Sequence, residues 1–241
     1  MGTVFSFDIR APGVSAHALQ GVVDWLHRMD AMFSTYRPDS EISRLDRGSL
    51  QPGECSPEVH EVLELCEQAS RDSGGYFTAR LPGGLDPSGM VKGWAVERAS
   101  TMLQAAGSTA HAVNGGGDIQ LLGKPQDGRP WTIGIADPFR RTALATTVAG
   151  TDMAVATSST AERGQHIIDP ISGRPATALA SITVTGRHLT TVDAYATAAL
   201  AMGDKAKSWI SGLSGVEAFA ITATGERWQT PNFPTARKPE D

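Results

Sequence analysis

Residues 85–94 read Leu-Asp-Pro-Ser-Gly-Met-Val-Lys-Gly-Trp, and residues 112–119 read Ala-Val-Asn-Gly-Gly-Gly-Asp-Ile. A third block, Thr-Thr-Val-Asp-Ala-Tyr-Ala-Thr, spans residues 190–197. Together these blocks contain Asp, Lys, Asn and Thr side chains and a glycine run. Oxygen ligands suit hard cations such as Mg²⁺, and lysine binds phosphate as a point charge. If the fold brings the three blocks together, they can hold a pyrophosphate and a divalent cation.

Composition limits the classes of protein to which the chain can belong. With 241 residues, 40% of them hydrophobic, it can bury a substantial core. The formal net charge of -5 and the dispersed basic residues argue against binding to nucleic acid, which requires clustered Lys and Arg. No run approaches the ~18 consecutive apolar residues of a membrane span. We therefore predict a globular protein with no nucleic-acid partner and no membrane span.

Hydrophobic periodicity predicts helices and strands in separate groups. Helical spacing covers residues 15–33, 56–74 and 93–106 and begins again near Asp193 and Asp204, whereas β patterns cover residues 5–9, 131–135, 153–157, 181–185 and 216–222. Because the strands cluster, the pattern favours an α+β fold over a doubly wound sheet. We expect one domain over residues 1–229 and a disordered tail over residues 230–241, which contain three prolines.

The glycine run from Asn114 to Asp118 has two possible roles. Glycine runs that bind dinucleotides or form P-loops lie between a strand and a helix, but this one leads into an apolar segment, residues 119–122, that is too short for a helix. It is therefore neither motif. From the residues alone, it is either a tight turn or a loop whose backbone amides approach a ligand.

Other candidate residues also have a structural alternative. Asp193 and Thr197 are four residues apart, so a helix would place both on one face, but Asp also caps helices and Thr also bonds back to carbonyls. Asp86 and Lys92 can form a surface ion pair. His166 is the best candidate for a general base because its ordinary pKa is about 6.5, although a lone His is commonly a surface residue.

The order of the motifs carries a further signal. Besides the three blocks, the chain begins Met-Gly-Thr, has Ser-Thr-Tyr-Arg-Pro-Asp-Ser-Glu at residues 34–41, and has His-Ile-Ile-Asp-Pro at residues 166–170. This series resembles the ApbE family, the FAD:protein FMN transferases, from Met1 to about Gly203. The resemblance implies two closely packed lobes built on antiparallel sheets with flanking helices, an architecture related to the T-fold.

The resemblance also implies a role for individual residues. Mg²⁺ would be held by Asp193, Thr197 and the carbonyl of Gly89, and His166 would deprotonate the acceptor hydroxyl. The side chain of Lys92 would lie near the phosphates. The residues expected to contact FAD are Met1, Tyr36, Tyr76, Phe77, Thr78, Asp86, Lys92, Asn114, Gly115, Gly116, Gly117, Asp118 and His166. As isolated residues, Met1 and Tyr36 would be predicted to lie in the core.

The implied reaction is Mg²⁺-dependent transfer of FMN from FAD, the substrate, to a Thr or Ser hydroxyl of an acceptor flavoprotein, with release of AMP. An FAD pyrophosphatase and a flavin-binding protein without turnover remain alternatives. Thr78 and Ser159 depart from residues common in the family, and these departures concern acceptor recognition more than FAD binding. Ala196 stands where some relatives have a further Asp, which leaves one metal ligand fewer. As written, the chain is expected to be cytoplasmic; if a signal peptide has been removed, it would be exported or lipid-anchored.

Overall fold

A computed structural model describes residues 2–10, 13–125, 128–160 and 167–236. The helices are α1 (Ala16–Phe33), α2 (Glu41–Asp46), α3 (Pro57–Asp72), α4 (Ser88–Ala105), α6 (Leu189–Met202) and α7 (Ala206–Ser211), with 3₁₀ turns at Pro52–Glu54 and Gly203–Lys205. The strands are β1 (Phe5–Ile9), β2 (Arg80–Leu81), β3 (Gly84–Leu85), β4 (His111–Gly115), β5 (Asp118–Leu122), β6 (Trp131–Asp137), β7 (Arg140–Gly150), β8 (Ala154–Ser159), β9 (Ile168–Asp169), β10 (Arg174–Pro175), β11 (Leu179–Gly186), β12 (Glu217–Thr222) and β13 (Arg227–Gln229).

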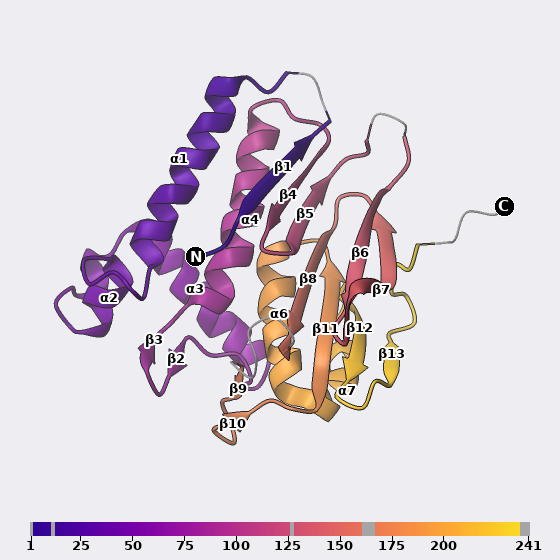
Figure 1. Cartoon of the computed structure of the whole chain (residues 1–241). Helices are drawn as coiled ribbons and strands as arrows, with labels where there is room; N and C mark the ends of the chain where they lie inside the picture. Colours follow the sequence, from indigo (N-terminus) through magenta and orange to yellow (C-terminus); the bar gives the residue numbers. More distant parts are fainter. Residues whose placement is uncertain (1, 11–12, 126–127, 161–166, 237–241) are drawn as a thin grey trace.

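A seven-stranded sheet forms the centre of the protein, in the order β1-β4-β5-β8-β11-β12-β13. Every neighbouring pair in it is antiparallel. Helices α4 and α6 lie against one face of the sheet, and the β6–β7 hairpin lies over the other face (Figure 1). The predicted α+β fold, with antiparallel strands and flanking helices, is confirmed.

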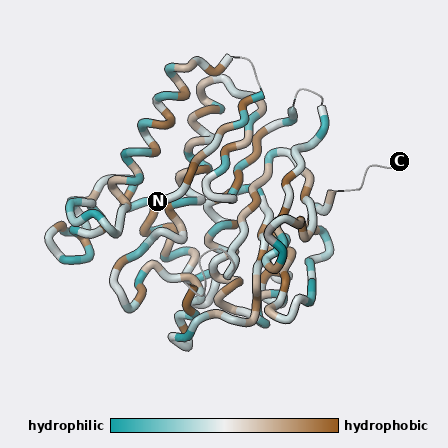
Figure 2. Tube along the Cα trace, in the orientation of Figure 1, coloured by the Kyte–Doolittle hydropathy of each residue, from teal (hydrophilic) through white to brown (hydrophobic). Residues whose placement is uncertain are grey.

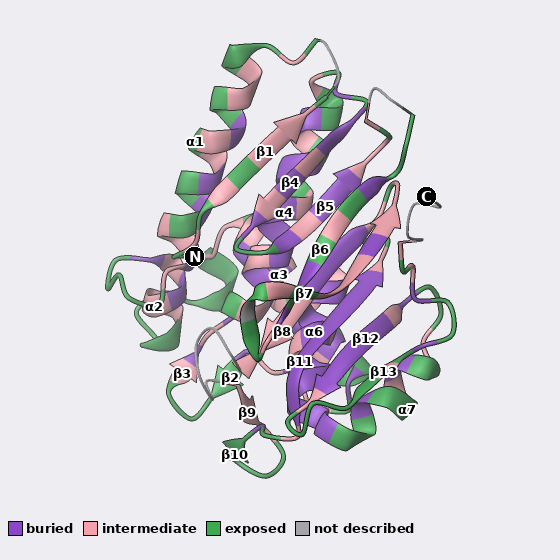
Figure 3. Ribbon diagram, turned by 45° about the vertical axis from the view of Figure 1, so that its right-hand side comes forward, coloured by how far each residue is buried: buried purple, intermediate pink, exposed green. Residues whose placement is uncertain are grey.

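The two faces of the sheet bury two separate groups of apolar side chains. The larger group contains the buried faces of α1, α3, α4 and α6. The smaller group joins Ile135 and Val148 of the β6–β7 hairpin to Val155, Phe219 and Ile221 of the sheet. Apolar and polar residues alternate along α1 (Figure 2), whereas β11 and β12 are largely buried (Figure 3). Strands covered on both faces are expected to be apolar almost throughout.

Two helices begin earlier than their sequence patterns suggest. α4 begins at Ser88 instead of Gly93. Pro87 is its N-cap residue, and the Asp86 side chain accepts the N–H of Ser88, the first helical residue, at 2.9 Å. α6 begins at Leu189 instead of near Asp193, with the Glu97 side chain of α4 accepting the Thr190 N–H at 2.9 Å. Gly89, Lys92 and Asp193 consequently lie within helices.

The predicted disorder from Thr230 onward is wrong for residues 230–236. Thr230 is buried and its hydroxyl accepts the Ala218 N–H at 2.9 Å. Phe233 packs on Phe219 with ring centroids 5.8 Å apart, and Thr235 bridges to Val148 of β7. The prolines are accommodated because this segment pairs only briefly along a strand edge. Residues 237–241 lie outside the described part of the chain.

None of the helices in the described ranges has the length and apolar character that crossing a membrane requires.

One buried histidine makes stability depend on pH. His111 in β4 is fully buried, with Nδ1 2.8 Å from the Ser108 hydroxyl and Nε2 2.7 Å from the Ser100 hydroxyl. Burial lowers its pKa from 6.5 to about 4. Between these values the unfolded chain binds a proton that the folded protein does not, so stability falls as the pH drops.

We therefore predict that His111→Gln flattens the pH dependence of unfolding between pH 6.5 and 4. The pKa shift corresponds to about 3 kcal/mol, which the parental protein loses over this range and the variant does not. Urea unfolding at a series of pH values measures the difference. His60→Gln, at an exposed position on α3, is the matched control; parallel curves for the parental protein and His111→Gln would contradict the prediction.

Candidate functional site

Lys92, Asp118 and Asp193 come together from three segments that are distant in the sequence. The Lys92 Nζ contacts the Asp118 Oδ2 closely and lies 3.5 Å from the Asp193 Oδ1. The carboxylate side chains are only 1% and 4% exposed, whereas the Lys92 side chain is 25% exposed. This buried charge cluster is formed by α4, the start of β5 and α6.

Gly93 allows α4 and α6 to approach closely enough for this contact. A Cβ atom at Gly93 would lie 2.7 Å from the Asp193 Cβ and 2.8 Å from the Leu189 carbonyl oxygen. Gly115, at the end of β4, is similarly close to α4, since a Cβ there would lie 2.6 Å from a methyl group of Val96. The two glycines therefore set the distances between the elements that carry the charged residues.

The Asp193 carboxylate is bonded to α4. Its Oδ2 accepts the Gly93 N–H at 2.9 Å, and Asp193 is the fifth residue of α6. It therefore does not cap α6, which excludes that alternative. In a regular helix the Gly93 N–H would belong to the carbonyl of Gly89, four residues earlier. The Gly89 carbonyl thus has to share this donor with Asp193.

Gly89 and Thr197, the other two predicted metal ligands, are neighbours. A Cβ at Gly89 would lie 3.8 Å from the Thr197 Cγ2, and Thr197 follows Asp193 by one helical turn. The three predicted ligands thus converge and offer only oxygen donors, which fits Mg²⁺. Within the described residues there is no group of three or more His, Cys, Asp or Glu side chains that could hold a metal. A site here would depend on one carboxylate with a hydroxyl and a carbonyl.

The glycine run forms the turn between β4 and β5. Gly116 and Gly117 have φ values of 61° and 97°, and the Asn114 side chain accepts the Gly117 N–H at 2.9 Å. The turn reading is therefore confirmed. Both glycines are exposed, so a ligand can approach the backbone of the turn closely. Their N–H groups are engaged within the protein, that of Gly117 by Asn114 and that of Gly116 by the Val4 carbonyl at 3.1 Å. Asp118 is different, because its buried carboxylate bonds to Lys92 and to the Thr157 N–H, the latter at 2.9 Å.

Burial and neighbouring charges shift the proton affinities in the cluster. The pKa of Asp193 is raised to about 7, because burial, the largest cause, and the Asp118 charge raise it by more than the Lys92 charge and the Gly93 hydrogen bond lower it. For Lys92, burial lowers the pKa, but Asp193 and Asp118 more than offset this, so its pKa is above the ordinary value. Lys92 is therefore charged at neutral pH. One ammonium group faces two carboxylates, and this balance favours a further cation.

Asp86 and Lys92 do not form the ion pair that their spacing allows. The carboxylates paired with Lys92 are Asp118 and Asp193. The Asp86 Oδ1 instead accepts the Ser88 N–H. Asp86 thus fixes the first turn of α4, which carries Gly89 and Lys92.

Tyr36 lies on the surface, so the core alternative for it is wrong. It is 96% exposed. Its loop is held by Ser34, whose hydroxyl accepts the Tyr36 and Arg37 N–H groups at 3.3 Å and whose carbonyl accepts the Ser40 hydroxyl at 2.6 Å. An exposed aromatic ring on an ordered loop can stack on a planar ligand.

The aromatic run at residues 76–78 is mostly occupied by protein contacts. Phe77 is buried, and a Cβ at Gly89 would lie 3.3 Å from its ring. The Tyr76 hydroxyl accepts a hydrogen bond from the Lys205 Nζ at 2.9 Å, and the Thr78 hydroxyl accepts the Arg80 N–H at 3.1 Å. Phe77 can therefore act on a ligand only through the turn of α4 that it supports. Met1 and His166 lie outside the described residues.

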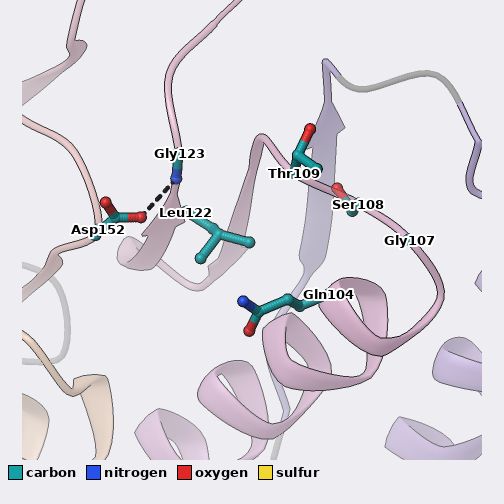
Figure 4. Close-up of a pocket in the computed structure, with 7 residues that line it drawn as sticks. All are labelled: Gln104, Gly107, Ser108, Thr109, Leu122, Gly123 and Asp152. Atoms are coloured by element: carbon teal, nitrogen blue, oxygen red, sulfur yellow. Dashed lines mark hydrogen bonds between the residues drawn. The ribbon is translucent and has the colours of Figure 1, made fainter.

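A pocket elsewhere in the protein is remote from this cluster. It has a volume of about 360 Å³ and lies at the other end of α4 (Figure 4), where it is lined by Gln104, Gly107, Ser108, Thr109, Leu122, Gly123 and Asp152. Its one carboxylate, Asp152, accepts the Gly123 N–H at 2.8 Å. The pocket therefore lacks the combination of charges found at Lys92, which is the better candidate for chemistry.

Comparison with known proteins identifies the family. Residues 1–82 and 78–220 match the sequence model described as "ApbE family". The chain belongs to the ApbE family. An FAD:protein FMN transferase of Vibrio cholerae is 26% identical over 94% of this chain and 86% of its own length; one of Rhodobacter capsulatus is 28% identical over 93% of this chain and 42% of its own length. The structure of the flavin transferase ApbE from Vibrio cholerae has the same fold, with a TM-score of 0.84 and 23% identity over 97% of this chain and 95% of that one.

Sequence reasoning missed two features of this ApbE site. The role of Gly93 depends on the crossing of α4 and α6, and the Thr157 bond to Asp118 depends on the pairing of β5 with β8. The only sequence signal for the first was a glycine inside an otherwise helical pattern, which often marks close packing.

We predict that Gly93→Ala destabilises the protein by about 1–3 kcal/mol, because the added methyl group would overlap Asp193 and push α4 from α6. Gly21→Ala is the matched control, since Gly21 lies within α1 and a Cβ there meets nothing within 4 Å. That control should raise stability by about 0.5–1 kcal/mol through the usual advantage of Ala in a helix. Urea unfolding of both variants decides; equal stabilisation of the two would show that Gly93 has no packing role.

Proposed function

We propose that the protein transfers FMN from FAD to a Thr or Ser hydroxyl of an acceptor flavoprotein in a Mg²⁺-dependent reaction that releases AMP. The observation that carries the proposal is the buried charge cluster beside Gly89 and Thr197. This cluster supplies one ammonium group and a set of oxygen ligands. The Lys92 side chain is partly exposed, so a ligand can reach the ammonium group from solvent. The names of the two relatives, FAD:protein FMN transferase, give the reaction class.

Three residues would hold the metal in this proposal. They are Asp193, through the Oδ1 atom that does not bond to Gly93, Thr197 through its hydroxyl, and Gly89 through its carbonyl. A helix carbonyl normally accepts the N–H four residues later, and the Gly89 carbonyl shares that donor, the Gly93 N–H, with Asp193. When bound, Mg²⁺ would neutralise charge on the phosphate oxygens.

Other residues of the chain would bind and orient FAD. Lys92 would place its positive charge next to the pyrophosphate, where it offsets charge on the departing AMP phosphate. The exposed turn at Gly116 and Gly117, which has no side chains, would let the phosphates approach the backbone closely. The Tyr36 ring, which its loop holds in solvent, would stack on one of the two ring systems of FAD.

The transfer itself exchanges one phosphorus–oxygen bond for another. The acceptor hydroxyl oxygen would attack the phosphorus on the FMN side, and the bond from that phosphorus to the bridging oxygen would break. AMP leaves with the bridging oxygen. His166 would take the proton of the hydroxyl.

Asp193→Asn tests the metal site without removing its support. The amide oxygen can still accept the Gly93 N–H, but the charge that would bind Mg²⁺ is lost. We expect AMP release from FAD to fall ~10²-fold or more, the usual effect of losing electrostatic stabilisation of a transition state. Chromatographic detection of AMP in reactions with and without Mg²⁺ measures this. Release that is unchanged in the variant, or independent of Mg²⁺ in the parental protein, would refute the proposed site.

His166→Ala tests the proposed base. We expect transfer to fall roughly 10²-fold or more while FAD still raises the melting temperature, because the ligand binds the native state whether or not the base is present. Flavin fluorescence that stays with the denatured acceptor on a gel reports transfer. His188→Ala, at an exposed residue bonded to Glu97, is the control. AMP release without fluorescent acceptor would indicate hydrolysis of FAD, and FAD binding without AMP release would indicate a binding protein.

A further inference from the structure

Each carboxylate of the charge cluster has one oxygen fixed by the backbone and the other directed at Lys92. Asp193 is bonded to the Gly93 N–H through Oδ2 and faces Lys92 with Oδ1. Asp118 is bonded to the Thr157 N–H through Oδ1 and faces Lys92 with Oδ2. A single ammonium group therefore has two possible carboxylate partners, and it lies closer to Asp118.

Asp118 is held by the sheet and cannot follow Lys92. Its side chain is buried at the start of β5, between the turn of the glycine run and β8. Thr157, which donates its N–H to Asp118, is itself fixed, because its hydroxyl lies 2.8 Å from the hydroxyl of the buried Thr183 in β11. The Lys92 side chain, in contrast, is long and partly exposed, so its ammonium group can move.

The position of the Lys92 ammonium matters because Asp193 Oδ1 is the atom left to bind a metal ion. A lysine paired with that oxygen would oppose the cation both by occupying the carboxylate and by charge repulsion. The Lys92 Nζ lies 3.5 Å from the Asp193 Oδ1, and Asp118 is the closer of its two carboxylate partners.

We propose that Asp118 is a positioning residue that holds the Lys92 ammonium away from Asp193, so that Asp193 Oδ1 remains available to the divalent cation. This inference rests on the metal site of the proposed function. It also changes the role of Asp118. Its buried carboxylate acts on the ligand through Lys92, whereas the resemblance implied a direct contact with FAD.

A double-mutant cycle on metal binding tests the proposal without using the reaction. Mn²⁺ serves as the probe for the Mg²⁺ site, and its binding to the full chain without FAD is measured by the electron paramagnetic resonance of the free ion. The proteins are the parental chain, D118N, K92M and the double variant K92M/D118N. Such a cycle isolates the coupling between Asp118 and Lys92 from the effect of either residue alone.

We expect D118N to raise the Kd for Mn²⁺ at least tenfold, because Lys92 then has only the Asp193 carboxylate as a charged partner. In the K92M background, the factor by which the same substitution raises the Kd should be at least three times smaller than in the parental chain, since no ammonium is left to compete. An equal effect in both backgrounds, or a larger effect in K92M, would overturn the proposal. The larger effect would identify Asp118 as a metal ligand or a simple source of negative charge.

Controls separate this inference from the proposed function. D193N should abolish the Mn²⁺ site; if it does not, the metal site itself is wrong, whatever Asp118 does. D137N removes another buried, paired carboxylate, bonded to Arg140 and Arg227 in and near the β6–β7 hairpin, and should leave the Kd unchanged. If D118N does not fold, D118E replaces it. The longer carboxylate keeps the charge but moves the ammonium toward Asp193, so it should also weaken Mn²⁺ binding, and unchanged binding would overturn the proposal.

Discussion

The contact of one ammonium group with two buried carboxylates sets the geometry of the site. Lys92 and Asp118 are 26 residues apart, and the Gly93 to Asp193 hydrogen bond spans 100 residues. Removing one partner of such a buried cluster leaves an uncompensated charge and lowers the free energy of unfolding by about 3–5 kcal/mol. Replacing the whole cluster by apolar residues, in contrast, is often neutral or stabilising. Stability alone therefore does not explain why these residues are charged. The proposed function would explain it, because it requires the cluster to bind a charged ligand.

Close backbone packing makes this contact possible. α4 and α6 meet where Gly93 has no side chain, and β4 meets α4 at Gly115. The same arrangement turns the Gly93 N–H toward Asp193, which affects the carbonyl of Gly89 one turn earlier. Packing and chemistry are thus coupled at one residue, because the glycine that brings the helices together also determines which oxygen atoms remain available.

The sequence predicted the elements of this fold better than the connections between them. Helices α1 and α3 follow from their apolar spacing, and β6, β8, β11 and β12 from theirs, since each buries one face or both. Asp193 looked like the start of a helix because its signal is identical to that of an N-cap. The start at Leu189 is instead fixed by side chains from other elements, since Gln120 of β5 accepts the Leu189 N–H and Glu97 of α4 accepts the Thr190 N–H. The segment around Phe233 looked disordered because its prolines are visible in the sequence, whereas its contact with Phe219 is not. The bond between Asp118 and Thr157 depends on strand register, which no local pattern specifies.

The exposure of the three charged residues indicates the direction from which a ligand can reach them. The carboxylates are almost completely buried and bonded to backbone N–H groups from the protein side, while Lys92 is the member of the cluster that solvent reaches most. A ligand therefore meets a positive charge first, and a carboxylate oxygen beyond it. In the proposed function, a pyrophosphate that arrives with its cation would satisfy both, because its oxygens could bind the ammonium group while the cation bound Asp193 Oδ1. When both leave, Lys92 and its two carboxylates still compensate one another, so the site keeps its structure between ligands. This arrangement accounts for a lysine in a position where a metal site alone would have no need of one.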